Sequence, residues 1–173
     1  MNLLEGTESA VRVNGRLTPS FKITTGVPQG DVMSPKLFIV GINHVLEAVE
    51  ERGVGGAMFK QRKLYDLAYA DDLAMFCDPI DQLQMMLEGL QEAADRVGLV
   101  INQTKTKIMH VARNQPPALP TVTLRGVDLE WVKDFVYLGS KVADSGGATA
   151  EINRRTGIMA GAFEKFRKIF NPL

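Results

Sequence analysis

Two adjacent aspartates stand between two short apolar segments, and this pattern restricts how the chain can fold more than any other. Residues 63–77 read KLYDLAYADDLAMFC, which predicts two strands joined by a turn that carries Asp71 and Asp72. The two like charges repel each other, and burial would raise the cost of ionising either carboxyl group. A divalent cation would compensate them, since Mg²⁺ prefers carboxylate oxygens. The plain alternative is an aspartate-rich turn in solvent.

Helical and strand-like segments alternate along the rest of the chain. Residues 11–13 and 21–24 are expected to form a hairpin around Asn14-Gly15, a pair that tolerates positive φ. Apolar periodicity predicts helices over residues 34–52 and 79–97, and a last helix with an apolar stripe over 152–170. Further strand-like segments are residues 99–101, 107–111, 122–124 and 135–138. This order predicts an α+β fold, in which the first two helices pack on one face of a small antiparallel sheet centred on the 63–77 hairpin.

The composition is that of a globular chain without a strong overall charge. Its 173 residues are 45% hydrophobic and include 20 basic and 20 acidic side chains. The chain can therefore bury a core as one domain, or as a domain with an appendage, and any nucleic acid would have to bind at local patches. The single cysteine, Cys77, excludes an intramolecular disulfide framework and is typical of a reducing, intracellular compartment. No apolar stretch reaches the roughly 18 to 20 residues of a membrane span.

Four segments, in order, resemble the motifs of reverse transcriptases of the LINE (non-LTR) type. They are residues 21–38 (FKITTGVPQGDVMSPKLF), similar to the Gln-Gly motif; 69–72 (YADD), similar to the catalytic aspartate hairpin; 98–107 (GLVINQTKTK), similar to the lysine-bearing motif; and 135–140 (FVYLGS), similar to the primer grip. The likeness runs from about residue 10 into the last helix. It implies a polymerase palm over residues 1–145 and the start of a thumb-like helix over 146–173.

The resemblance also implies a role for each matching residue. Asp71 would be the main ligand of Mg²⁺ or Mn²⁺, with Asp72 as its weaker partner. The other implied site residues are Lys105 at the leaving pyrophosphate, Gln29, Gly30 and Tyr69 at the incoming deoxynucleotide and template, and Tyr137, Leu138 and Gly139 at the primer. The implied reaction is attack of a DNA primer 3′-hydroxyl on the α-phosphate of a deoxynucleotide, directed by an RNA template.

The last predicted helix is basic. It carries Arg154, Arg155, Lys165, Arg167 and Lys168 against Glu151 and Glu164, a net charge of +3. A solvated face is the usual reason for such a run of charges. The thumb position implied by the resemblance adds a second interpretation, in which Arg154, Arg155, Lys165 and Lys168 contact nucleic-acid phosphates.

One part of the family pattern is not found. The motif before the Gln-Gly segment should supply another metal-binding aspartate, but the first aspartate here is Asp31, and the earlier Glu5 and Glu8 lie in an unlike context. The basic fingers segment is not found either. We therefore expect an N-terminally truncated fragment of an RNA-directed DNA polymerase, which binds metal weakly and does not extend a primer alone.

The alternative function is non-catalytic. A retroelement-derived domain can also serve as a nucleic-acid-binding or protein-interaction module, with an open sheet edge covered by a second copy, by the missing N-terminal segment or by another partner. In either case the sequence favours a protein of the nucleus or cytoplasm that has no membrane partner.

Overall fold

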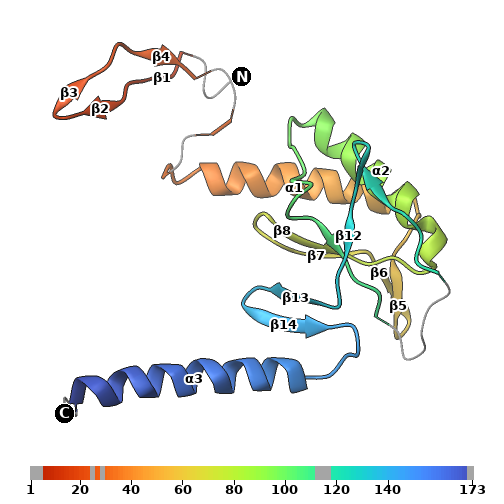
Figure 1. Ribbon diagram of the computed structural model, residues 1–173. Helices are drawn as coiled ribbons and strands as arrows, with labels where there is room; N and C mark the ends of the chain where they lie inside the picture. Colours follow the sequence, from red (N-terminus) through yellow and green to blue (C-terminus); the bar gives the residue numbers. More distant parts are fainter. Residues whose placement is uncertain (1–5, 24–25, 28–29, 112–117, 171–173) are drawn as a thin grey trace. The chain divides into compact units, whose positions relative to one another are not determined.

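The chain divides into two compact units, Met1–His44 and Val45–Leu173. The computed structural model describes residues 6–23, 26–27, 30–111 and 118–170, and the side chains of the last helix up to residue 167. Helix α1 (Ser34–Glu50) begins in the first unit and ends in the second (Figure 1). Of the predicted site residues, Gln29 and the Lys168 side chain lie outside the described part.

Four short strands form the first unit. They are β1 (Glu8–Ser9), β2 (Arg12–Val13), β3 (Arg16–Leu17) and β4 (Phe21–Lys22). The turn at Asn14-Gly15 is confirmed, with φ values of +50° and +80°. The predicted pairing of residues 11–13 with 21–24 is wrong, because the two-residue turn brings β2 against β3, while β4 pairs with β1.

The other helices lie in the second unit. Helix α2 (Leu83–Arg96) follows the 3-10 turn η1 (Ile80–Gln82), and α3 spans Thr149–Phe170. Helices were predicted in all three places. Gly98 ends α2 as expected: its φ of +74° lets the amide of Leu99 turn back to the carbonyl oxygen of Ala94 at 2.9 Å, a helix end that favours glycine. No helix in the described residues has the length and apolar character that a bilayer crossing requires.

The strands of the second unit form two-stranded ribbons. Antiparallel pairs are β5 (Ala57–Phe59) with β6 (Arg62–Leu64), β7 (Asp66–Tyr69) with β8 (Asp72–Met75), β10 (Thr123–Leu124) with β11 (Val127–Asp128), and β13 (Asp134–Tyr137) with β14 (Ser140–Ala143); β9 (Lys107–Ile108) runs parallel to β12 (Glu130–Trp131). The α+β class is therefore confirmed. The expected small antiparallel sheet centred on residues 63–77 is wrong, because each sheet of the described residues has two strands and β7 pairs with β8 alone. Residues 99–101, expected as a strand, form none; Leu99 and Ile101 instead pack against the core.

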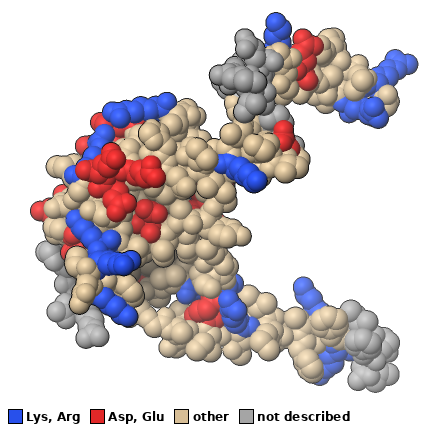
Figure 2. All heavy atoms as spheres, turned by 180° about the vertical axis from the view of Figure 1, so that it is seen from behind, with Lys and Arg blue, Asp and Glu red and all other residues tan. Residues whose placement is uncertain are grey.

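One hydrophobic core joins these elements. Its buried side chains are Val45 and Val49 of α1, Met86, Leu87, Leu90, Ala93 and Ala94 of α2, and Val122, Leu124 and Leu129 of the following ribbons. Leu73 and Met75 of β8 pack against the same cluster, so the core formed by α1 and α2 supports the β7–β8 hairpin along β8. The surface is mixed in charge, because acidic and basic side chains are interspersed on the face drawn in Figure 2.

Leu124 should be among the most costly core residues to truncate, because it is only 1% exposed. Leu124→Ala leaves a cavity and should lower the free energy of unfolding by about 2–5 kcal/mol in urea denaturation. Val127→Ala, on the facing strand and 49% exposed, is the control and should change it by less than about 1 kcal/mol. Equal losses in the two variants would contradict this assignment of the core.

Candidate active site at the aspartate hairpin

The β7–β8 hairpin, named here the aspartate hairpin (residues 66–75), places its two adjacent carboxylates at the tip. Tyr69 pairs with Asp72 in register, so Ala70 and Asp71 alone form the turn. Ala70 has a φ of +53°, a left-handed conformation that costs a residue with a β-carbon about 1–2 kcal/mol. The paired strands hold this strained turn in place, as is common where a tip has a function.

The side chains at the tip are open to solvent. Asp71 and Asp72 are exposed, and Tyr69 exposes 67% of its surface. Carboxylate oxygens in this setting are suitable ligands for a hard divalent cation. Within the described residues, however, no three His, Cys, Asp or Glu side chains gather as a metal-binding group. The tip thus offers two carboxylates, and water would have to complete the coordination of any ion.

A third carboxylate, Asp66, lies at the base of the same hairpin. It is half-buried, and its pKa is raised first by burial and then by the nearby charge of Glu50. Asp66 pairs with Met75 and stands three residues before Tyr69, which is about 10 Å along a strand. It therefore cannot complete a metal site at the tip.

Tyr137 ties the aspartate hairpin to the β13–β14 hairpin (residues 134–143). Its hydroxyl donates a hydrogen bond to the backbone carbonyl oxygen of Leu67 at 2.9 Å, which joins strands 70 residues apart in sequence. Beyond Tyr137, the turn at Leu138 and Gly139 has φ values of +48° and +79°, the type I′ geometry of tight hairpins. Leu138 is half-exposed at this turn.

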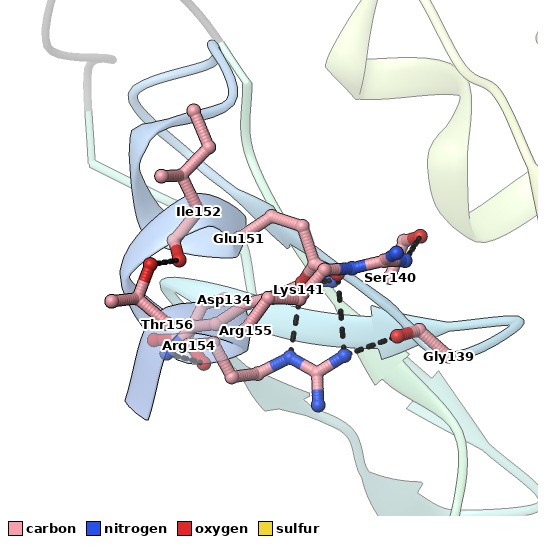
Figure 3. Close-up of polar contacts among 9 residues, drawn as sticks. All are labelled: Asp134, Gly139, Ser140, Lys141, Glu151, Ile152, Arg154, Arg155 and Thr156. Carbon is pink, nitrogen blue, oxygen red and sulfur yellow. Dashed lines mark hydrogen bonds and ion pairs between the residues drawn. The ribbon is translucent and has the colours of Figure 1, made fainter. Parts of the chain in front are cut away.

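The same turn is held from its other side by the first turn of α3 (Figure 3). The Glu151 carboxylate accepts hydrogen bonds from the backbone amide of Lys141 at 2.6 Å, from Arg154 Nε at 2.9 Å and from Arg155 Nε. Arg154 also donates to the carbonyl oxygen of Gly139, and Arg155 to the Ser140 hydroxyl at 3.4 Å. We call these residues (139–141, 151, 154 and 155) the Glu151 cluster.

Electrostatics favour the charged form of Glu151. The hydrogen bonds from Arg154, then Arg155, and then the Lys141 amide lower its pKa from 4.5 to about 2. The pKa of Arg154 is raised by the same contact. Glu151 also lies in the first turn of α3, where the helix dipole favours a negative charge. The carboxylate therefore stays ionised, and the contact stays intact, over the whole physiological pH range.

The remaining predicted site residues that the structure describes are Lys105, Lys165 and Gly30. Lys105 is exposed, in a turn that Asn102 holds through its side-chain oxygen, 3.2 Å from the Lys105 amide. Among the ion pairs of the described residues, none joins Lys105 to either tip aspartate. Lys165 is exposed on α3. Gly30, with a φ of +93°, belongs to the first unit.

The contacts by which Glu151 joins α3 to the β13–β14 hairpin were not predicted from the sequence. A signal was present, since Glu151 precedes Arg154 and Arg155 by three and four residues, the spacing at which helical side chains meet. The contacts with Gly139 and Lys141 had no such signal. The Tyr137 hydrogen bond to Leu67 had none either, because nothing local links two residues so far apart.

Comparison with known proteins identifies the family. The family model described as reverse transcriptase (RNA-dependent DNA polymerase) matches residues 2–142, which include the aspartate hairpin and nearly all of the β13–β14 hairpin. The chain therefore belongs to the reverse transcriptase family. Enzymes of this family generally use divalent metal ions, and the intact enzymes act on a nucleic-acid template and primer.

The relatives narrow the class to reverse transcriptase domains of LINE-type elements, as the sequence predicted. The chain is 26% identical over 163 residues to the Pol polyprotein from type-1 retrotransposable element R2 of Popillia japonica, covering 90% of this chain and 27% of that protein. It is 31% identical over 124 residues to the Pol polyprotein of element R2DM of Drosophila melanogaster, covering 70% and 11%. It is 28% identical over 141 residues to the RNA-directed DNA polymerase from mobile element jockey of Drosophila funebris, covering 78% and 15%. The chain thus spans about a quarter or less of the length of these three relatives.

Removing the Tyr137 hydroxyl should weaken the aspartate hairpin. Tyr137→Phe deletes the hydrogen bond to Leu67 and should lower the free energy of unfolding by about 0.5–1.5 kcal/mol, with NMR shift changes at the amides of β7. Tyr69→Phe is the matched control, because the Tyr69 ring is mostly exposed, and it should leave stability unchanged. Loss of stability without any shift change in β7 would show that Tyr137 acts elsewhere.

The Glu151 cluster should respond to acid in a defined direction. A lowered pKa in the folded state means that the contact contributes its full stability above pH 4.5 and loses it as the pH falls toward about 2. The Lys141 amide resonance should therefore titrate with a midpoint near 2, and the step should vanish in Glu151→Gln. A midpoint at the ordinary value of 4.5 would contradict the geometry of the cluster.

Proposed function

We propose that this chain is a catalytic-centre segment of a retroelement RNA-directed DNA polymerase. One observation carries the proposal: in a chain of the reverse transcriptase family, two exposed carboxylates stand side by side at the tip of a braced hairpin. In this proposal residues 1–145 form part of a polymerase palm, and residues 146–173 begin a thumb-like helix. The substrates are an RNA template, a DNA primer and deoxynucleotides.

Asp71 and Asp72 would hold the divalent cation, Mg²⁺ or Mn²⁺, with Asp71 as the main ligand. When bound, such an ion supplies positive charge that neutralises phosphoryl oxygens during nucleotidyl transfer. The protein's contribution is to fix the carboxylates: the strand pairing sets their place, and the strained turn at Ala70 presents them to solvent. With only two carboxylates gathered in the described residues, the affinity of this chain for the ion should be low.

The other site residues take positioning roles in this proposal. Tyr69 would lie beside the incoming deoxynucleotide, and Lys105 would stabilise the leaving pyrophosphate. Gln29 and Gly30 keep the nucleotide-binding role that the resemblance implies for them. The turn at Leu138 and Gly139 contacts the primer. Tyr137 directly precedes that turn and would anchor it to the aspartate hairpin, since its hydroxyl is bonded to Leu67.

The basic residues of α3 divide into two groups. Arg154 has its guanidinium in the Glu151 cluster and exposes 31% of its side chain, so its first role is to hold the primer turn. Arg155 is also bonded to Glu151 but exposes 63% of its side chain, and in this proposal it contacts phosphates together with the exposed Lys165. Lys168 has the same proposed role, and its side chain lies outside the described part. A phosphate of the primer strand would have to approach beside Gly139 to reach Arg154 as well.

A second function, as a protein-interaction module, is favoured by one observation on α3. Ile152, Met159 and Phe163 expose 60%, 71% and 71% of their surfaces along this helix. Such a stripe is typical of a face that another helix covers. This function does not require the aspartates, so substitution of the tip distinguishes the two proposals.

Metal binding tests the proposed catalytic centre. Isothermal titration with Mn²⁺ or Mg²⁺ should show a dissociation constant well above micromolar, and Asp71→Ala with Asp72→Ala should abolish binding. Asp128→Ala, an exposed carboxylate on another hairpin, is the control and should leave binding unchanged. Submicromolar affinity, or affinity that survives the double substitution, would contradict the proposed site.

Primer extension tests the catalytic competence of the chain by itself. Because two carboxylates hold a metal pair poorly, the purified chain with an RNA template, a DNA primer and Mg²⁺ or Mn²⁺ should give no measurable DNA synthesis. A full-length reverse transcriptase in the same buffer is the positive control. Robust synthesis that Asp71→Ala abolishes would overturn this expectation and show that another acid completes the site.

A further inference from the structure

The β5–β6 hairpin, named here the basic hairpin (residues 57–64), is anchored at its base and free at its tip. At the base, the Gly56 amide donates to the Phe76 carbonyl oxygen at 2.7 Å, and the Asp78 amide donates to the Gly56 carbonyl oxygen at 2.9 Å. These bonds attach the hairpin to the chain just after β8. In the view of Figure 1, the basic hairpin points downward and the aspartate hairpin points to the left, so the two tips face different directions.

The basic hairpin has an unusual charge for a chain that is neutral overall. Between residues 53 and 65 there is no acidic residue, while Lys60, Arg62 and Lys63 are all basic. None of these three takes part in an ion pair within the described part of the chain.

The three cations are not equivalent. The stem of Lys63 lies over Gly56, where an added β-carbon would come within 2.9 Å of it, and its ammonium group donates to the Gly53 carbonyl oxygen at 3.3 Å. Lys63 is therefore held against the protein. Lys60 and Arg62, one in the turn and one in the first position after it, are left to interact with a ligand.

An exposed aromatic ring, Phe59, neighbours both cations. Phe59 pairs with Arg62 in register, so the two side chains share one face of the hairpin. The Lys60 ammonium lies 5.9 Å from the centre of the Phe59 ring. Phe59 is nevertheless 66% exposed, and the residues from Phe59 to Arg62 line a shallow hollow. An exposed ring flanked by unpaired cations is a suitable platform for a base and its phosphates.

We propose that the basic hairpin binds a single-stranded nucleic acid, with a base stacked on Phe59 and phosphates at Lys60 and Arg62. Single-strand binding requires this combination of a ring and nearby positive charge, because every base has a flat face and every nucleotide a phosphate. The surface lies apart from the two aspartates and needs no metal. This proposal rests on the proposed function in one respect only, which is that the ligand is a nucleic-acid strand.

Fluorescence anisotropy with a labelled oligouridine tests the proposal. Phe59→Ala should weaken binding at least about fivefold, as loss of a stacking side chain does, and Phe59→Trp should restore it. Lys60→Ala with Arg62→Ala should reduce the slope of log affinity against log salt by about 1.4, since each phosphate contact to a single strand contributes about 0.7. A duplex of the same length should be far less sensitive to Phe59→Ala.

The control is the hairpin of the first unit, where Arg12→Ala with Arg16→Ala removes the same charge from strands that carry no aromatic residue. This pair should leave oligouridine affinity within about twofold of the unsubstituted chain. Equal weakening by the control pair, or no weakening by Phe59→Ala, would overturn the proposal and leave only a diffuse charge effect.

Photo-crosslinking of thiouridine-labelled RNA should map to residues 57–64, and crosslinks confined to other segments would also overturn the proposal. The metal titration does not depend on Phe59, so failure here is distinguishable from failure of the proposed catalytic centre.

Discussion

The hydrogen bond from the Tyr137 hydroxyl to the Leu67 carbonyl oxygen is the contact on which the arrangement of the site depends. A two-stranded ribbon is only marginally stable by itself in water, and the aspartate hairpin also carries a strained turn at Ala70. The core supports β8 of this hairpin through Leu73 and Met75. Tyr137 supports the other strand, β7, at Leu67. The carboxylates are thus fixed from two directions.

The β13–β14 hairpin, which carries Tyr137, is itself held in place by the Glu151 cluster. Glu151 brings together the amide of Lys141 and two arginines, one of which also reaches the Gly139 carbonyl oxygen. A continuous series of polar contacts therefore runs from the start of α3, through the turn at Leu138, to the aspartate hairpin. A primer held at that turn would be kept in a fixed relation to the metal-binding tip, which is what in-line nucleotidyl transfer requires. The basic hairpin lies outside this series of contacts, so its binding of a strand can change without disturbing the carboxylates.

The sequence was sufficient where local chemistry determines structure. The aspartate hairpin was placed correctly because its apolar strands flank a polar turn. The end of α2 was placed correctly to within one residue because Gly98, just beyond it, adopts a positive φ. Local patterns failed where two arrangements share the same residues: Val13 pairs with Arg16 across a two-residue turn rather than with a strand farther on. Leu99 and Ile101 look like a strand but serve as core side chains. The contact of Tyr137 with Leu67 depends on packing between distant segments. The sequence therefore placed each residue in a strand but could not predict that the two residues touch.

The aspartate hairpin is stabilised by Tyr137 and the Glu151 cluster, and not by the pairing of its own two strands alone. Hydrogen exchange of backbone amides in Glu151→Gln measures this directly, because Glu151 touches the β13–β14 hairpin and α3 but not β7 or β8. Protection should fall at residues 139–155 and also, by a smaller factor, in β7 and β8. Loss of protection confined to residues 139–155, with the aspartate hairpin unchanged, would contradict this stabilisation.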